Sequence, residues 1–268
     1  MCRWLAYSGS PIHMSSLILK PENSLINQSH DARESISTLN GDGFGIGWYD
    51  SRPEPGQFRD ILPAWNDSNL KNIAEQVRSP LFFAHVRAST GTPTSRTNSH
   101  PFKHGKWLFM HNGKIGNFER LRRDISFLIA PELFPCLQGT TDSETFFFLL
   151  LTNGLEKDPA RAFTQSIEQV QELMDAAGVE EPLTLTAAAT DGEAIYAIRY
   201  ASNNKPPTLY YGCSVSLTDT FGKELNTGDN ATLILSEPLS QSQASWNEVP
   251  PGHFLVAGDG AVSTAPIG

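Results

Sequence analysis

A cysteine occupies position 2, directly after the initiator residue Met1. Removal of Met1, which a small second residue permits, places a thiol and a free α-amino group on the same residue. A thiol with a pKa of about 8.5 is a weak nucleophile at neutral pH, whereas an α-amino group with a pKa of about 7.7 to 8.0 can accept its proton. Cys2 therefore has the chemistry of a nucleophile that carries its own base, and a chance cysteine is the simpler alternative.

A second group of residues could stabilise negative charge. His111-Asn112-Gly113 follows an apolar run at 107–110 that predicts a buried strand. At such a strand end, the Asn112 amide and the Gly113 backbone N–H can point together, and two neutral donors aimed at one point form an oxyanion hole for acyl transfer. Asn-Gly is also the commonest hairpin dipeptide, so a plain turn is the alternative.

Two charged residues could bind the ends of an amino-acid substrate. Arg87 follows another apolar run and lies among small hydroxyl residues, where its guanidinium can pair with a carboxylate through two hydrogen bonds. Asp142 begins a predicted helix and can accept a hydrogen bond from an ammonium group. The alternatives are a surface ion pair for Arg87 and a helix-capping role for Asp142.

The elements that must position these residues follow the order strands, helices, strands. In the segment 44–49 the residues Phe44, Ile46 and Trp48 alternate with glycines, and a glycine face lets another backbone approach closely. Asn117, Thr141 and Asp158 are predicted N-caps, Asp191-Gly192 predicts a hairpin, and 51–56 and 203–207 read as surface loops. We expect strands over 3–8, 44–49, 81–87, 107–110, 183–190, 194–200, 208–211, 231–236 and 254–257, and helices over 117–128, 145–152 and from Asp158 to a stop at Gly178.

Composition limits the class of protein. The chain has 268 residues and a formal net charge of −9 without a basic run, so nucleic-acid binding has little electrostatic support. It lacks the apolar core of a signal peptide and any stretch of about 18 apolar residues, which predicts a cytoplasmic protein without a membrane partner. We expect one domain over 1–268, of the α+β class, with two sheets and helices outside them.

Metal and nucleotide sites have weak support. Three widely spaced cysteines do not form a thiolate zinc motif or a disulfide framework. His100 and His104 could serve as metal ligands, but Pro101 disfavours a helix that would place them on one face. The glycine run at 41–47 does not have the spacing of a dinucleotide-binding loop. The sequence therefore predicts neither a metal nor a cofactor.

Taken in order, these segments resemble the class II glutamine amidotransferases, which are N-terminal nucleophile hydrolases. The likeness covers roughly the first 155 residues. Three segments also resemble small stand-alone members, among them the γ-glutamyl hercynylcysteine sulfoxide hydrolases: Cys2-Arg3-Trp4-Leu5, Asn40-Gly41-Asp42-Gly43 and Pro63-Ala64-Trp65-Asn66-Asp67. The matching segments are Cys2, Gly41-Asp42-Gly43-Phe44-Gly45-Ile46-Gly47, the stretch from His85 to Thr90, Asn98-Ser99-His100-Pro101-Phe102, the stretch from His111 to Phe118 and Thr141-Asp142-Ser143-Glu144.

The resemblance implies a four-layer αββα sandwich and a role for each matching residue. Cys2 would attack the γ-carbonyl of glutamine or of a γ-glutamyl conjugate and form a thioester, and Asn112 with the Gly113 amide would hold the oxyanion. On the substrate side, the resemblance assigns binding roles to Arg87, Asp142, His100 and Thr90. Where larger members have Trp-Ala after the arginine, this chain has Ala88-Ser89, which alters substrate-side contacts.

Three functions stay open at this point. The first is a stand-alone γ-glutamyl amidohydrolase acting on a small molecule. The second is a glutaminase subunit that delivers ammonia to a separate synthase, and the third is a non-catalytic or metal-binding protein. Only about 110 residues follow the shared motifs, so we expect no synthase domain in this chain. The sequence identifies neither an oligomeric state nor an ammonia-accepting partner.

Overall fold

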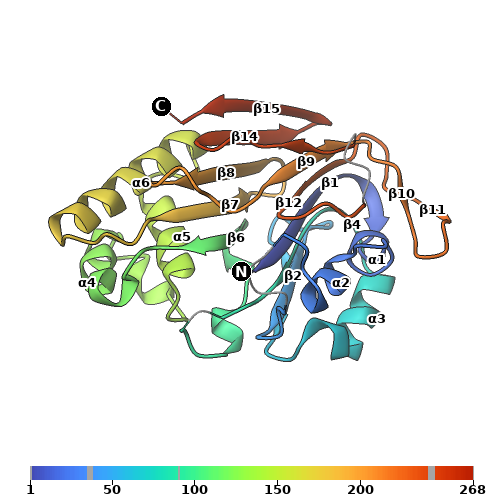
Figure 1. Ribbon diagram of the computed structural model, residues 1–268, viewed down its shortest axis with the longest axis horizontal. Helices are drawn as coiled ribbons and strands as arrows, with labels where there is room; N and C mark the ends of the chain where they lie inside the picture. The colour runs from blue at the N-terminus through green and yellow to red at the C-terminus, as the bar shows by residue number, and fades with distance from the viewer. Residues whose placement is uncertain (1, 35–38, 90, 241–244, 268) are drawn as a thin grey trace.

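The chain folds into two antiparallel sheets that pack face to face, with helices on both outer faces (Figure 1). The computed structural model describes residues 2–34, 39–89, 91–240 and 245–267, and the statements below concern these residues. This arrangement is the expected four-layer αββα sandwich, so the predicted fold class is confirmed. None of the helices in the described residues is long and apolar enough to cross a membrane.

The first sheet contains the start of the chain near its centre. Its strand order is β13-β9-β12-β1-β4-β2-β3, so the strand that follows Cys2 pairs with β12 on one side and β4 on the other. The strands are β1 (Arg3–His13), β2 (Phe44–Trp48), β3 (Gly56–Asp60), β4 (Arg78–Val86), β9 (Tyr210–Cys213), β12 (Thr232–Leu235) and β13 (Asn247–Glu248), and the helices beside this sheet are α1 (Ser15–Ile18), α2 (Leu25–His30) and α3 (Ser68–Gln76).

The second sheet has the order β15-β14-β8-β7-β6-β5. A small separate hairpin pairs β10 (Leu217–Thr218) with β11 (Glu224–Leu225). The strands of the second sheet are β5 (Phe102–His104), β6 (Trp107–Lys114), β7 (Thr184–Thr190), β8 (Ile195–Ala201), β14 (His253–Gly258) and β15 (Ala261–Pro266), and the helices that cover it are α4 (Phe118–Leu128), α5 (Asp142–Thr152) and α6 (Pro159–Ala176).

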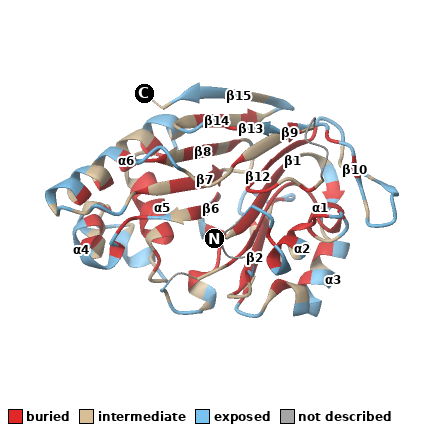
Figure 2. Ribbon diagram, viewed as in Figure 1, coloured by how far each residue is buried: buried red, intermediate tan, exposed pale blue. Residues whose placement is uncertain are grey.

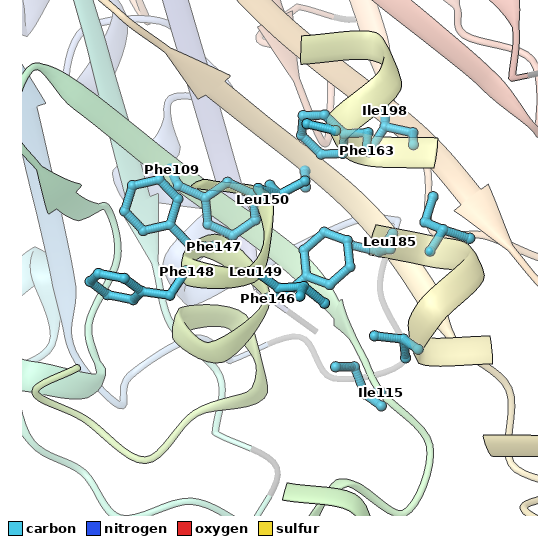
Figure 3. Close-up of a cluster of buried hydrophobic side chains, with 14 of the residues drawn as sticks. Phe109, Ile115, Phe146, Phe147, Phe148, Leu149, Leu150, Phe163, Leu185 and Ile198 are labelled. Carbon is cyan, nitrogen blue, oxygen red and sulfur yellow. The ribbon is translucent and has the colours of Figure 1, made fainter. Parts of the chain in front are cut away.

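Buried hydrophobic residues form three clusters, and the ribbon segments coloured as buried in Figure 2 lie mainly on the sheets and on the helices that cover them. One cluster fills the space between the sheets, where Trp4 and Phe83 of the first sheet meet Leu108 and Met110 of the second. Another joins the second sheet to its helices through aromatic rings such as Phe109, whose ring stacks on Phe147 with centroids 5.3 Å apart (Figure 3). The apolar helix α5 is therefore held firmly against β6.

The glycine face of β2 meets the second layer closely, as its sequence predicts. A Cβ atom on Gly45 would overlap the carbonyl oxygen of His100, and one on Gly47 would lie 2.7 Å from Cδ1 of Leu108. Larger residues at either position would push the sheets apart. The glycines thus allow the segment around His100 to pack directly on the first sheet.

Several local predictions are confirmed and others are wrong. The Thr141 hydroxyl accepts a hydrogen bond from the Glu144 backbone and Asp158 caps α6, as expected. Asn117 occupies the N-cap position of α4 as expected, but its side chain makes no cap bond and its backbone is left-handed, with φ 51°. The strand β6 continues to Lys114, beyond the expected end at 110, and β3 and β15 were not expected, because both are edge strands without a regular apolar alternation.

Candidate active site

Cys2 immediately precedes β1 and is anchored by the segment that follows β4. The Ala88 backbone N–H lies 3.4 Å from Cys2 Sγ, and the thiol lies 3.6 Å from the Ala88 carbonyl oxygen. Since Arg3 is paired with Val86, the ends of β1 and β4 carry Cys2 and Arg87 to the same end of the first sheet. The side chain of Cys2 is half-buried.

Strand alternation places the predicted site residues on the surface between the sheets. Trp4 and Phe83 belong to the inter-sheet core, so Cys2 and Arg87, at even spacing from them, face the same space. Met110 belongs to the same core from the opposite sheet, and Asn112 is two residues further along β6. The two sheets thus present these three residues toward one region.

The His-Asn-Gly segment is the end of a strand and not a hairpin turn. His111 to Lys114 pair with β7 in continuous register, so the turn alternative is wrong. His111 points to the opposite face and contacts the Ser143 hydroxyl at 2.8 Å and the Thr184 carbonyl at 3.1 Å. A Cβ atom on Gly113 would overlap the same carbonyl, which explains why this position is glycine.

The Asn112 side chain is buried without using its donor. Only 1% of the residue is exposed, and its Nδ2 has no hydrogen-bond partner among the described residues. An unpaired buried donor costs about 1 to 3 kcal/mol, so such groups are rare unless they serve a function. The Asn112 amide is therefore available to a substrate atom in the inter-sheet space.

A cavity of about 270 Å³ lies beside Gly113 and Asp142. Pockets that hold drug-sized ligands are generally larger, so this volume suits a ligand group as small as one amino acid. It brings together the end of β6, the first residue of α5 and the loop after β4. Its lining residues are Gly91, Thr92, Gly113, Lys114, Ile115, Asn117, Phe118, Glu119, Asp142 and Glu181.

The carboxylate of Asp142 lies at the wall of this cavity, where it ties α5 to the end of β6. Its Oδ2 accepts a hydrogen bond from the Ile115 backbone at 2.9 Å, and its Oδ1 accepts one from the Ser143 backbone at 2.7 Å. The N-cap itself is Thr141, but Asp142 is an acid in the first turn of α5 that accepts a bond from a backbone N–H there, so the alternative role at the helix start is supported alongside the bond to Ile115. The carboxylate therefore has a fixed position from which it can accept a bond from a ligand.

Arg87 is buried, 3% exposed, and its guanidinium is held by neighbouring loops. Nη2 donates to the Thr92 hydroxyl at 2.6 Å and to the Ser89 hydroxyl at 3.2 Å, and Nη1 donates to the Asp42 carbonyl at 3.3 Å. The surface ion-pair alternative for Arg87 is wrong, because the side chain points inward. Arg87 does not line the cavity itself, and Thr92 is the link between the two.

The structure does not bring His100 to the cavity. The His100 ring is buried and stacks on His85 with centroids 4.2 Å apart, and none of the four ring nitrogens has a hydrogen-bond partner among the described residues. His104 lies elsewhere, against the ring of Phe148, so the two histidines whose spacing suggested metal ligands, His100 and His104, do not stack on one another. Thr90, the remaining predicted substrate contact, lies outside the described residues.

Burial is the largest influence on the Cys2 thiol and raises its pKa above the ordinary value. The hydrogen bond from Ala88 and the positive charges of Arg87 and Arg3 oppose this rise without reversing it. The thiol is therefore mostly protonated at neutral pH. Nucleophilic reaction at Sγ requires a base that takes up this proton.

Burial also lowers the pKa of both stacked histidines, that of His85 to about 3. An unfolded histidine binds a proton below a pH of about 6.5, so below that pH the unfolded chain holds more protons than the folded one. The stability contributed by the neutral pair is complete above about pH 6.5 and is lost as the pH falls toward the folded pKa values.

We therefore expect the free energy of unfolding to decrease on acidification, by up to about 1.4 kcal/mol per histidine per pH unit between about pH 6.5 and 4.5. Urea denaturation at several pH values measures this slope. The variant His100→Gln has one buried titrating group fewer and should show a shallower slope. His13→Gln, which changes an exposed histidine, is the matched control. Identical slopes in wild type and His100→Gln would contradict the prediction.

Some contacts of the site were not predicted from the sequence. Ala88 and Ser143 lie inside the recognised motifs, and only the folded chain reveals that they contact Cys2 and His111. Arg3 and Glu237 form a buried ion pair beside Cys2, although they lie 234 residues apart in the sequence. Because Glu237 lies outside every motif, no feature of the sequence indicated it.

Comparison with known proteins identifies the family. The family model described as "Glutamine amidotransferases class-II" matches residues 16–266. The chain belongs to this family. Class II glutamine amidotransferases are enzymes of the N-terminal nucleophile type, so the chain is an enzyme of this type.

This class II glutamine amidotransferase has relatives that match all or nearly all of its own length. It is 34% identical over 301 residues to the "Probable glutamine amidotransferase DUG3" of Saccharomyces cerevisiae, covering all of this chain and 84% of the yeast protein. It is 36% identical over 257 residues to the "Gamma-glutamyl-hercynylcysteine sulfoxide hydrolase" of Mycobacterium tuberculosis, covering 95% and 92% of the two chains. A solved glutamine aminotransferase class-II domain protein from Silicibacter pomeroyi superposes with a TM-score of 0.75 at 35% identity over both complete chains.

Proposed function

We propose that the protein is an amidohydrolase that cleaves the γ-glutamyl amide of glutamine or of a γ-glutamyl conjugate through a thioester on Cys2. The unpaired, buried Nδ2 of Asn112 is the observation that carries this proposal. Asn112 lies next to Gly113 and faces the same inter-sheet space as Cys2. Two neutral donors at that point suit the oxyanion that forms when a thiol attacks an amide carbonyl.

In the proposed reaction, the α-amine of Cys2, freed by removal of Met1, takes the thiol proton. The sulfur then attacks the γ-carbonyl, and the leaving amine departs with this proton. Water hydrolyses the thioester and releases glutamate with regeneration of the thiol. The raised pKa of the half-buried thiol supports the need for a base on the same residue.

The proposed substrate contacts are Asp142 for the α-ammonium group and Arg87 for the α-carboxylate. Asp142 and Gly113 line one small cavity, and Thr92 connects this cavity to the Arg87 guanidinium. We also propose that 1–268 forms one glutamine amidotransferase domain, because one core cluster contains residues of both sheets. His100 supports the site by packing, through its contact with His85 and the glycine face of β2.

A glutamate-release assay tests the proposal. Purified protein, with its N-terminus defined by mass spectrometry, is incubated with glutamine and with a panel of γ-glutamyl amides and γ-glutamyl thiol conjugates. Release of glutamate from any of them supports the proposal, and the preferred compound identifies the leaving group. Release from glutamine alone would favour the glutaminase-subunit alternative. Processed, folded protein that releases glutamate from none of them would contradict the proposal.

Asp142→Ala is expected to lower kcat/KM by about 10- to 100-fold, mainly through KM, because a charge-assisted hydrogen bond contributes about 1.5 to 3 kcal/mol. Initial rates over a range of substrate concentrations measure the change. Glu119→Gln alters an exposed acid of the same cavity and serves as the control, with little change in KM. An unchanged KM in Asp142→Ala would remove Asp142 from the substrate site.

A further inference from the structure

Arg3 lies on the other side of the first sheet from the Cys2 thiol, yet it contacts Cys2 directly. Leu5 belongs to the core between this sheet and α1 to α3, so by alternation the Arg3 side chain faces the same side. Its Nη1 donates to the Cys2 carbonyl oxygen at 3.2 Å, and its Nε donates to Glu237 Oε2 at 3.1 Å. The Arg3 residue is fully buried.

The Glu237 carboxylate accepts several hydrogen bonds besides the one from Arg3. This carboxylate, on a residue only 2% exposed, accepts hydrogen bonds from the Asn23 side chain at 3.1 Å and from the backbone N–H groups of Arg33 and Glu34 at 3.2 and 3.0 Å. The carboxylate therefore joins the start of β1, the segment around α2 and the end of β12. Among the described residues, one guanidinium and three neutral donors compensate its charge.

Ser236, the residue before Glu237, also forms hydrogen bonds with the start of β1. The Ser236 backbone N–H donates to the Trp4 carbonyl at 3.0 Å, and the Trp4 N–H donates to the Ser236 hydroxyl at 2.9 Å. The segment 236–237 thus runs beside Trp4 and Arg3, directly after the last paired residue of β12. The hydrogen bonds from this segment therefore continue the first sheet up to the start of β1, next to Cys2.

Cys2 needs such support because of its place in the chain. Once Met1 is removed, no preceding residue restrains the Cys2 main chain, and its position depends on contacts from Ala88 to the sulfur and from Arg3 to the carbonyl. A displacement of about 1 Å at a reacting group can lower the rate by about 100-fold. A buried ion pair is also a weak source of stability, so a role other than stability accounts better for this one.

We propose that Arg3 and Glu237 form a buried clamp that orients the main chain of Cys2, so that both are positioning residues for the nucleophile. This proposal rests on the proposed role of Cys2. The clamp acts through the carbonyl of Cys2 and leaves its amine and thiol free to react. In addition, the positive charge of Arg3 favours the thiolate and opposes the rise of the thiol pKa caused by burial.

The test uses three variants in a background that carries Cys136→Ser and Cys213→Ser, so that Cys2 is the cysteine that iodoacetamide can alkylate. Glu237→Gln removes a charge that accepts four hydrogen bonds, Arg3→Met removes the clamp cation, and Arg3→Lys keeps the charge without the planar fork. Circular dichroism and thermal unfolding establish which variants are folded. The control, Asp191→Asn, removes a carboxylate that likewise accepts two backbone N–H groups and a cation, at the far end of β7 from the site.

We expect kcat to fall by about 10- to 100-fold in Glu237→Gln and Arg3→Met, and by less in Arg3→Lys, with KM unchanged. Alkylation of Cys2 should become slower at neutral pH in Arg3→Met, with its pH profile shifted upward. Asp191→Asn should retain the wild-type kcat and alkylation rate. If neither Glu237→Gln nor Arg3→Met folds, Arg3→Lys decides, because it preserves the buried charge.

Folded clamp variants with wild-type kcat and wild-type alkylation would overturn the clamp. An equal loss in Asp191→Asn, or a change confined to KM, would do the same. The alkylation readout also separates the two proposals. If the wild-type protein released no glutamate, the proposed function would fail, and the clamp would still be judged by the reactivity of Cys2 in the variants.

Discussion

Cys2→Ala is expected to abolish glutamate release, a loss of more than about 1000-fold, because no other group in the proposed mechanism can form the thioester. The fold should persist, since Cys2 precedes β1 and is half-buried, outside the hydrophobic core clusters. Substrate-concentration series with the best γ-glutamyl compound measure the loss, and thermal unfolding checks the fold.

The exposed cysteines provide the control for this prediction. Cys136→Ala and Cys213→Ala each remove a free thiol that lies on the surface, and both should leave the rate unchanged. A second form, in which an uncleaved N-terminal extension precedes Cys2, keeps the thiol and blocks the amine, and it should be inactive as well. Full activity in either the extended form or Cys2→Ala would remove the N-terminal nucleophile mechanism.

Asn112→Ala is expected to lower kcat by about 100- to 1000-fold, which is the usual cost of losing one oxyanion donor. The loss should fall on kcat more than on KM, because the oxyanion develops only during the reaction. The free energy of unfolding of Asn112→Ala should differ little from that of the wild type, although Asn112 is a buried polar residue. Nδ2 has no hydrogen-bond partner to lose within the part of the chain that the structure describes, and the removal of its desolvation cost offsets part of the cost of the cavity that the truncation creates.

Asn153→Ala is the matched control, because it also truncates an asparagine, in this case the C-cap residue of α5. Its amide donates to Ser166 and Gln169 of α6, away from the cavity. This variant should lose stability and retain kcat, the opposite of Asn112→Ala. Equal rates in wild type and Asn112→Ala would reduce Asn112 to a packing residue.

Local patterns predicted most of the elements around the site. Alternating and continuous apolar runs identified β2, β4 and β7, and the capping residues Thr141 and Asp158 marked the starts of α5 and α6. These patterns work because burial of one face and satisfaction of terminal N–H groups depend on residues close in the chain. Edge strands such as β3 and β15 were missed, since an exposed strand needs no apolar alternation.

The end of β6 shows where local patterns fail. Asn112-Gly113 is typical of a turn, but pairing with β7 extends the strand through both residues. Long-range pairing therefore overrides the local turn preference. The same pairing turns Asn112 toward the first sheet and His111 toward Ser143, which no short-range rule could have assigned.

The order and types of residues in this chain were sufficient to indicate a cysteine nucleophile, an oxyanion site, the layered fold and the family, because each depends on short motifs. The tertiary structure alone decided which of these residues meet. In the folded protein His100 stacks on His85 and Arg3 pairs with Glu237 beside Cys2. The Nδ2 donor of Asn112 has no hydrogen-bond partner among the described residues. Such contacts depend on how the two sheets pack against each other. They join residues that are far apart in the sequence, and the periodic patterns of helices and strands do not extend over such separations.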